Sequence, residues 1–274
     1  LGADRIWDGL AGFPDARGEG VVVGVIDSGI NWDHPSFSDD PEDGFVFENP
    51  YGAALGLCSD PEVMCNEKLV GVYDFVTDDP NTPDVEEENT KGKDNDGHGS
   101  HTASIAAGRA IEVSYEGLRR TISGVAPRAT LVTYRVCYLG ISDPETTENA
   151  GCQGSAILSA IDQAIVDGVD VINYSIGGDP RDPWQPGSDY MAFLNARAAG
   201  VFIASSAGNG GPEEGTVSAP ALAPWIIAVG NATHNVLRGT VVDNFTGGAS
   251  PAPDKLVGAS LRGDSGKLPI VHAR

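Results

Sequence analysis

Residues 94–108 read DNDGHGSHTASIAAG, an acidic, glycine-rich loop that leads directly into a run of small and apolar residues. The run has helical character, and His98 lies at the junction, where the flanking glycines constrain its backbone and its imidazole lies at a helix N-terminus. The small residues from Thr102 to Ala107 would let this helix pack closely against a sheet. A single loop histidine is seldom catalytic, so a catalytic interpretation of His98 depends on partners elsewhere in the chain.

Strand-like and helix-like segments alternate on both sides of this stretch. Val21 to Ile26 is a β-branched run that is bounded by glycines and ends before Asp27, as is typical of a buried parallel strand. Further strands are predicted over 68–75, 130–136, 169–176, 201–206 and 224–230, and helices over 98–108, 155–167 and 189–199. This alternation predicts an α/β fold with a parallel sheet that helices cover on both faces. The order of the strands does not follow from their spacing.

The pattern changes near Gly239. Residues 239–274 contain short β-like runs that Gly, Pro and Ser interrupt, without helical periodicity. We therefore expect residues 1–238 to belong to the α/β domain and residues 239–274 to form its exit and the start of a second unit. The length of 274 residues suits one large domain or two small ones.

The composition argues against several classes of partner. A net charge of −22, from 39 acidic and 17 basic side chains, repels nucleic acid and anionic membranes, so neither is expected as a partner. No apolar run reaches the roughly 18 residues of a membrane span, and the chain opens LGADRIWDGL, so an exported protein would already have lost its signal. Acidic clusters at 39–43 and 78–88 favour a solvated surface, although their oxygen ligands leave structural calcium as an open alternative.

The four cysteines are Cys58, Cys65, Cys137 and Cys152, and none forms a CxxC pair. Their spacing argues against zinc and thioredoxin-like sites. An even number of cysteines without metal-binding spacing favours disulfides and an oxidising compartment. Three connectivities are open, and we favour the local pairs Cys58–Cys65 and Cys137–Cys152, each of which would close a polar loop. Four reduced, buried thiols are the alternative.

Asp27, His98 and Asn209 together form a catalytic pattern. Asp27 follows a predicted buried strand, at the edge where open α/β sheets place their ligands. A carboxylate bonded to one imidazole nitrogen fixes the tautomer and leaves the other nitrogen as the base for a hydroxyl or thiol nucleophile. Asn209, in the glycine-bracketed turn SSAGNGG, offers an amide donor to a developing oxyanion. Taken alone, Asp27 is equally well explained as a strand-end residue that caps a turn.

Several motifs occur in the order found in one family of proteases. VIDSGINWDHPSF, DGHGSHTASIAAG, GVAPRATLVTYRVC, DGVDVINYSIGG and ASSAGNGGP resemble successive motifs of the subtilisin-like serine proteases, or subtilases. The resemblance covers residues 20 to about 230 and implies that family's fold and its hydrolysis of peptide bonds. The later stretch GPEEGTVSAPALAPWIIAVGN resembles the subgroup with a protease-associated domain inserted within the catalytic domain.

The resemblance implies a role for each matching position. Asp27 matches the catalytic aspartate, His98 the general base and Asn209 the asparagine of the oxyanion hole. The substrate-binding positions that match are Ser175, Ile176 and Gly177 on one wall of the primary specificity pocket and Ser206, Ala207 and Gly208 on the other. Small residues there imply room for a sizeable, apolar side chain at P1, the substrate residue before the scissile bond. The second histidine, His101, is expected to be structural.

The family's nucleophile motif, glycine-threonine-serine-methionine-alanine, does not occur in the chain. We expect the serine beyond the predicted insertion, on a companion segment or chain, so that these residues form the N-terminal portion of the enzyme and the fold is incomplete at its C-terminus. Ser265, in RGDSGKLP, resembles the serine motif of chymotrypsin-like proteases, but that family carries its triad in another order on two β-barrels. Ser28 and Ser218 lie in subtilase motifs without a nucleophilic role.

The sequence thus predicts part of a secreted serine endopeptidase that acts on protein or peptide substrates and needs no cofactor for its chemistry. A non-catalytic, peptide-binding pseudoprotease is the alternative, and the joint presence of Asp27, His98 and Asn209 argues against it. The N-x-S/T sequons at Asn173, Asn231 and Asn244 would matter only in a eukaryotic secretory pathway. Asn173 lies on a predicted buried strand beside the cleft, so we expect it to stay unmodified.

Overall fold

The computed structural model describes residues 2–9, 12, 16–40, 44–77, 91–115, 118–138, 151–232, 240–243 and 255–258. The chain divides into two units, Gly2–Asn231 and a second one that contains Ala232–Arg274. In the second unit, β12 (Thr240–Asp243) pairs antiparallel with β13 (Lys255–Gly258). The boundary near Gly239 and the inserted domain stay predictions.

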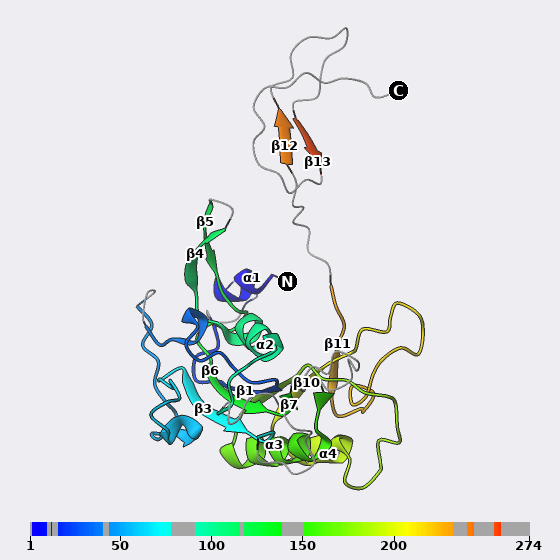
Figure 1. The fold of residues 1–274 in the computed structure, drawn as a ribbon. Coiled ribbons are helices and arrows are strands. Elements are labelled where there is room, and N and C mark those ends of the chain that lie inside the picture. The colour runs from blue at the N-terminus through cyan, green and yellow to red at the C-terminus, as the bar shows by residue number, and fades with distance from the viewer. Residues whose placement is uncertain are drawn as a thin grey trace, which may run out of the picture. The chain divides into compact units, whose positions relative to one another are not determined.

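A seven-stranded sheet forms the centre of the first unit (Figure 1). Its strands, in spatial order, are β11 (Ile227–Val229), β10 (Phe202–Ser206), β9 (Val171–Tyr174), β1 (Val22–Asp27), β6 (Thr130–Arg135), β3 (Leu69–Asp74) and β2 (Leu55–Gly56). Every pair of neighbours runs parallel, so all the carboxyl ends lie at one edge of the sheet. The central strand β1 places Asp27 at that edge, opposite Arg135 of β6.

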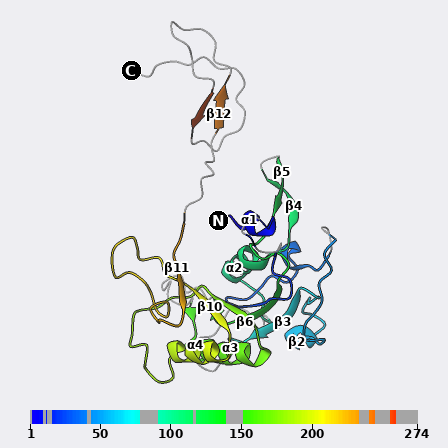
Figure 2. The same cartoon turned by 180° about the vertical axis from the view of Figure 1, so that it is seen from behind.

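Helices cover both faces of this sheet. They are α2 (His98–Ala107), α3 (Gly154–Asp167) and α4 (Asp189–Ala198). α2 lies on one face, and α3 and α4 lie on the other (Figures 1 and 2). The core divides in the same way, because successive residues of a strand point to opposite faces. Val25 of β1 belongs to the cluster that contains Ala103 of α2, whereas Ile26 belongs to the cluster that contains Ile161 of α3 and Phe193 of α4. The predicted doubly covered parallel sheet is thus confirmed.

Local sequence sets the ends of the helices. α3 ends at Gly168, whose φ of 70° is left-handed and therefore suits glycine. α4 begins after Ser188, whose hydroxyl accepts a hydrogen bond from the backbone N–H of Met191. Within the described part of the chain, none of the helices has both the length and the apolar character that a membrane crossing requires.

Several short elements were not predicted. An antiparallel hairpin, β4 (Ile111–Tyr115) with β5 (Leu118–Ile122), follows α2, and β7 (Cys137–Tyr138) pairs with β8 (Gly151–Cys152). β5 contains two consecutive arginines, which obscure the alternation of a half-buried strand. The short helices η1 (Pro35–Phe37) and η2 (Leu57–Ser59) were not predicted either, whereas α1 (Ala3–Trp7) lies where the opening of the chain has a helix-like pattern. The strand predicted over 224–230 is shorter in the structure, where β11 covers only its centre.

Candidate active site

Asp27 ends the central strand, and it is buried there. Its Oδ1 accepts a hydrogen bond from the backbone N–H of Ser28 at 2.7 Å and lies 2.7 Å from Nδ1 of His98. Its Oδ2 accepts a hydrogen bond from the hydroxyl of Thr102 at 3.3 Å. The structure therefore brings together Asp27 and His98, which lie 71 positions apart in the sequence.

His98 is the first residue of α2, and 48% of its side chain is exposed. Gly97 precedes it with a left-handed φ of 92°. Position 99 requires glycine because the backbone there lies close to the turn after β1, and a Cβ would collide with the carbonyl oxygen of Gly29. The two glycines thus let α2 start directly beside Asp27, which leaves the Nε2 side of the imidazole open.

The environment favours a protonated Nδ1 on His98. Burial opposes its charged form, but the hydrogen bond and the charge of Asp27, together with Asp96 and Asp94, outweigh burial and raise the pKa of His98. Burial also raises the pKa of Asp27, against the effect of its hydrogen bonds to His98 and Ser28. A carboxylic acid is ordinarily more acidic than imidazolium and the pKa of His98 is itself raised, so we assign the proton between the two groups to Nδ1, with Asp27 as the acceptor. Nε2 of the neutral ring is then a base.

Asp94 connects the turn after Asp27 to the beginning of α2. Its carboxylate is buried and accepts hydrogen bonds from the Ser28 hydroxyl at 2.9 Å and from the backbone N–H groups of Asp96, Gly97 and Ser100 at 3.2, 2.8 and 2.8 Å. The Ser28 hydroxyl in turn accepts the N–H of Gly99 at 2.8 Å. Ser28 is therefore engaged in positioning the loop. The sequence analysis did not single out Asp94, although it lies in the same motif as His98.

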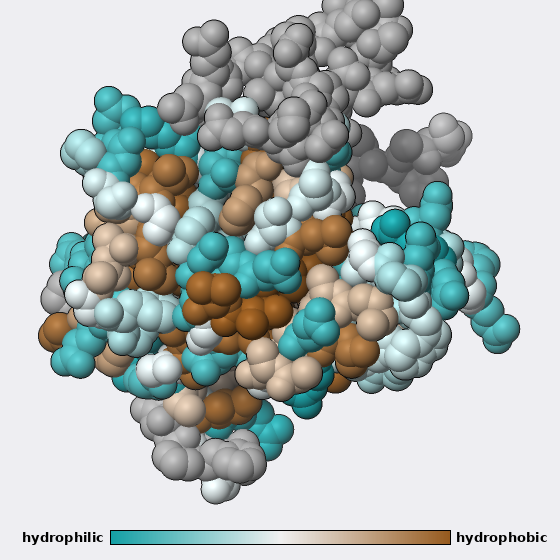
Figure 3. All heavy atoms as spheres, turned by 90° about the horizontal axis from the view of Figure 1, so that it is seen from below, coloured by the Kyte–Doolittle hydropathy of each residue, from teal (hydrophilic) through white to brown (hydrophobic). Residues whose placement is uncertain are grey.

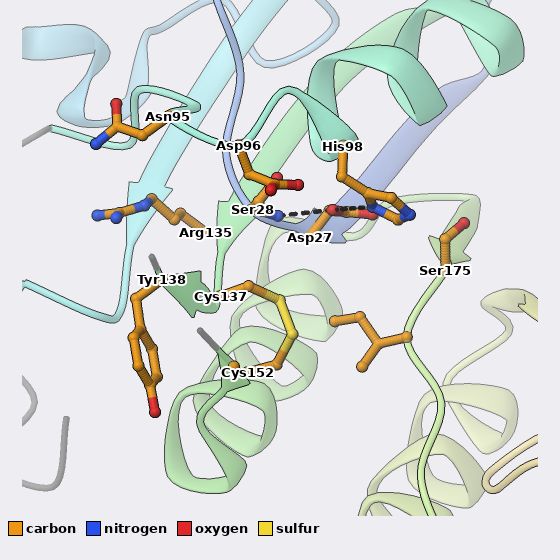
Figure 4. Close-up of a pocket in the computed structure, with 12 residues that line it drawn as sticks. Asp27, Ser28, Asn95, Asp96, His98, Arg135, Cys137, Tyr138, Cys152 and Ser175 are labelled. Carbon is orange, nitrogen blue, oxygen red and sulfur yellow. Dashed lines mark hydrogen bonds and ion pairs between the residues drawn. A yellow bond between two sulfur atoms is a disulfide. The ribbon is translucent and has the colours of Figure 1, made fainter. Parts of the chain in front are cut away.

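A pocket of about 300 Å³ opens beside this pair (Figure 4). Its lining includes Asp27, Asp96 and His98 on one side and the disulfide-bonded Cys137 and Cys152 on the other. Ser175 and Ile176, which follow β9, also line it, and so does Arg135. Two of the predicted substrate-binding residues thus lie in the same pocket as the Asp27–His98 pair.

The two predicted walls of the specificity pocket follow the neighbouring strands β9 and β10. Residues 218–219 form backbone hydrogen bonds to both walls. Gly178 exchanges two with Ala219, at 3.0 and 3.1 Å, and the carbonyl of Ala207 accepts one from the N–H of Ser218 at 3.0 Å. A Cβ at Gly177 or at Gly208 would lie 2.6 Å from the Ser218 hydroxyl oxygen. Both walls need glycine for this reason. That buried oxygen has no hydrogen-bond partner among the residues that the structure describes.

Asn209 lies on an exposed turn that follows β10 and residues 207–208. Because β10 and β1 have their carboxyl ends at the same edge of the sheet, the turn belongs to the edge that carries Asp27. No hydrogen bond to the amide of Asn209 occurs within the described residues, so its donors are unengaged. His101 is exposed on α2, and Ser265 lies outside the described residues.

Both predicted disulfides, Cys58–Cys65 and Cys137–Cys152, are present, so the expectation of local pairs is confirmed. Cys137–Cys152 joins β7 to β8 directly across the pair. Of the sequons, Asn173 donates a side-chain hydrogen bond to the Ser175 hydroxyl at 3.2 Å, Asn231 is exposed, and Asn244 lies outside the described residues. The described segments contain no group of three or more His, Cys, Asp or Glu residues arranged for a metal ion.

Comparison with known proteins gives consistent matches. Residues 18–264 match the family model described as the subtilase family. Among curated proteins of Arabidopsis thaliana, the chain is 36% identical to the subtilisin-like protease SBT1.5 over 258 residues, which cover 92% of this chain and 31% of the relative. It is 38% identical to SBT1.7 over 229 residues, with coverages of 81% and 28%, and 35% identical to SBT2.2 over 273 residues, with coverages of 95% and 30%. The chain therefore spans about a third of the length of these relatives.

Proposed function

The chain belongs to the subtilase family, and we propose that it is the N-terminal part of a secreted serine endopeptidase that hydrolyses peptide bonds through an acyl-enzyme. The observation that carries this proposal is the 2.7 Å contact between Oδ1 of Asp27 and Nδ1 of His98 at the carboxyl edge of the sheet. This contact orients a neutral imidazole toward an adjoining pocket and gives it the form of a general base.

Acylation then needs a serine, which a segment outside these residues supplies. Nε2 of His98 takes the proton of the serine hydroxyl while the serine oxygen bonds to the peptide carbonyl carbon. The buried Asp27 carboxylate stabilises the imidazolium that forms. His98 next gives this proton to the leaving amine as the carbon–nitrogen bond breaks. Deacylation follows the same steps in reverse. His98 takes a proton from a water molecule while the water oxygen bonds to the acyl carbon. The proton then passes to the serine oxygen as the acyl bond breaks.

Residues after β9 and β10 bind the substrate in this proposal. The segment Ser175–Gly177 pairs with the substrate backbone and, with Ser206–Gly208, walls the P1 side chain. Asn209 donates its unengaged amide to the oxyanion of the tetrahedral intermediate. In subtilisin itself, an asparagine in this role is known to stabilise the transition state by about 3–4 kcal/mol. The small residues Ser206, Ala207 and Gly208 of the second wall support a sizeable, apolar P1 residue.

Three observations support a companion segment that carries the serine. The family's nucleophile motif is absent from the sequence, and the chain covers 31% of the relative SBT1.5. The sheet unit also exposes large apolar side chains, which are Val166, Phe202, Ile227 and Val229 among others. Apolar residues gather in the middle of the face that carries α3 and α4 (Figure 3). Because contiguous apolar surface marks interaction sites, we expect further chain to cover part of it.

Three further parts of the proposal concern the inserted domain, secretion and calcium. We propose that residues 239–274 lead into an inserted protease-associated domain, and the antiparallel pair β12–β13 after a parallel α/β unit fits such a change of architecture. Secretion is supported by the two disulfides, which persist in oxidising compartments. The acidic clusters at 39–43 and 78–88, which lie largely outside the described residues, could supply oxygen ligands to a structural calcium ion, which the hydrolytic chemistry itself does not require.

The proposal is tested by labelling the purified full-length protein with a serine-directed fluorophosphonate. The intact mass of the labelled protein is measured to count the labels. We expect one label on a serine outside residues 1–274, lost in the His98→Ala variant because the base is gone. An intact His98 with no label on the full-length protein would indicate a peptide-binding pseudoprotease. A label on Ser265 would contradict the assignment of the nucleophile.

A further inference from the structure

The second carboxylate oxygen of Asp27 has a partner to which the proposed mechanism gives no role. Oδ1 lies 2.7 Å from Nδ1 of His98, whereas Oδ2 accepts a hydrogen bond from the Thr102 hydroxyl at 3.3 Å. Building on the proposed protease function, we propose that Thr102 is a positioning residue, whose hydroxyl holds Oδ2 and limits how strongly the Asp27 carboxylate attracts a proton to His98. Thr102 thus acts on the base through Asp27.

The two oxygens of Asp27 are held unequally. Oδ1 has two donors, which are the backbone N–H of Ser28 at 2.7 Å and Nδ1 of His98. Among the residues that the structure describes, the Thr102 hydroxyl is the only donor to Oδ2. The side chain of Asp27 is 2% exposed, so water has little access to this oxygen. One hydroxyl therefore determines how much of the negative charge is balanced at Oδ2.

The Thr102 hydroxyl has two possible acceptors. Thr102 follows His98 by four positions, which places both side chains on the same face of α2. Its Oγ1 lies 3.1 Å from the carbonyl oxygen of Gly99 and 3.3 Å from Oδ2 of Asp27. A hydroxyl has one proton and donates it to one acceptor at a time. Because hydrogen bonds to ionised acceptors are the stronger ones, the proton is directed to Oδ2 while Asp27 is charged.

The electrostatic effect of this bond has a definite direction. Burial is the largest influence on Asp27 and raises its pKa, whereas the Thr102 hydrogen bond lowers it. Negative charge that is balanced at Oδ2 attracts the imidazolium of His98 less strongly. Loss of the hydroxyl should therefore favour the protonated ring and raise the pKa of His98. A loosened contact between Asp27 and His98 would lower this pKa, so the two effects are distinguishable by their sign.

The other ionisable groups around the pair do not depend on Thr102. Those that face it from neighbouring elements are Asp94, Asp96, Arg135 and Tyr174. The two aspartates raise the pKa of His98 against the effect of its burial. Arg135 is paired with Asp74 at 3.0 Å, and burial raises the pKa of the Tyr174 phenol, which stays neutral. Within the described part of the chain, none of them bonds to the Thr102 hydroxyl, so a substitution at position 102 leaves these bonds in place.

The test replaces the hydroxyl by a methyl group of nearly the same shape. Thr102→Val is made in the purified full-length protein. The pKa of His98 is measured by NMR titration of its imidazole and from the acid limb of kcat/KM, where activity falls as pH decreases. We expect both to move to higher pH by about half a unit, the order expected for the loss of one hydrogen bond. At a pH well below this pKa, kcat/KM should then fall about threefold, because less of the ring is neutral.

Two variants control for effects other than the lost bond. Thr102→Ser retains the hydroxyl and should restore the titration of the wild type. Ser104→Ala is the matched control, because the Ser104 hydroxyl donates to the carbonyl of His101 at 2.8 Å in the same helix and has no bond to Asp27. It should leave the pKa of His98 unchanged. If Thr102→Val does not fold, Thr102→Ala lacks the same hydroxyl, favours a helix and carries the same expectation.

An unchanged or lowered pKa of His98 in the folded variant would overturn the role of Thr102. A rise that Thr102→Ser also shows would overturn it as well, because the hydroxyl would not be the cause. The NMR titration needs no turnover. A protein whose His98 responds as expected but which hydrolyses no peptide would therefore refute the proposed protease activity and leave the role of Thr102 intact.

Discussion

Asp27 and Asp94 hold His98, the proposed base, from two directions. Asp27 bonds to the ring itself, whereas Asp94 bonds to the backbone on either side of the ring and to the Ser28 hydroxyl. The two functions are separable, because Asp27 fixes the tautomer and Asp94 fixes the position of the helix start. Only the role of Asp27 follows from the spacing of sequence motifs. The role of Asp94 depends on its burial and on four hydrogen bonds that cannot be read from the sequence.

Asp94 is therefore a positioning residue, and we predict a specific kinetic effect. Asp94→Ala should lower kcat by about 10- to 100-fold with little change in KM, because a small displacement of a reacting group is costly. Asp94→Asn retains an acceptor for Ser28 and Gly97 and should recover part of the rate. Circular dichroism and KM establish that the variants are folded, and Asp162→Ala on α3 is the control. An unchanged kcat in folded Asp94→Ala would show that these hydrogen bonds do not position His98.

The elements themselves follow largely from local pattern. β1, β3, β6, β9 and β10 are short β-branched runs with glycine or polar residues at their ends, and all were predicted as strands. α2, α3 and α4 were predicted from helical spacing and small residues. The strand order was not predictable, because it depends on which apolar faces pack together after the chain has turned. The β4–β5 hairpin and the pairing of Asp74 with Arg135 were missed for a related reason, since their partners are fixed only by tertiary contacts.

The packing of Ser218 against Gly177 and Gly208, between the two proposed pocket walls, is also a tertiary feature, and it can be tested. Gly177→Ala should lower the free energy of unfolding by about 1–3 kcal/mol and raise KM, because the new methyl group overlaps Ser218. Ser218→Gly removes the obstacle, so the double variant should regain most of both losses. Denaturant unfolding and steady-state kinetics provide the readout.

Gly154→Ala is the matched control for this substitution, because a Cβ there meets nothing within 4 Å. It should leave KM unchanged and should not lower the free energy of unfolding, because Gly154 begins α3 and alanine favours a helix more than glycine does. Equal destabilisation by Gly177→Ala in the presence and absence of the Ser218 side chain would contradict the proposed contact.

The molecule as a whole carries the proposed base His98 and the proposed orienting acid Asp27 on a well-packed sheet, but its sequence lacks the family's nucleophile motif. The sheet unit Gly2–Asn231 has a core on both faces, and its exposed apolar side chains lie partly on β10 and β11 at one end of the sheet. In the proposed enzyme, added chain would cover this end and supply the serine. The contact between Asp27 and His98 needs none of that added chain, so this pair is the part of the proposed mechanism that the described residues contain.

The most direct measurement of this claim is the pH dependence of kcat/KM for the full-length protein and its Asp27→Asn variant. His98 must be neutral to accept a proton, so activity should fall as pH decreases through its pKa, which Asp27 and the nearby acids raise above the ordinary 6.5. Asp27→Asn should lower kcat by about 10⁴-fold, as the equivalent substitution does in the serine-protease triad. It should also move the acid limb to lower pH, because it removes the charge that favours imidazolium. A variant with undiminished kcat and an unmoved acid limb would contradict the role of Asp27 and with it the proposed mechanism.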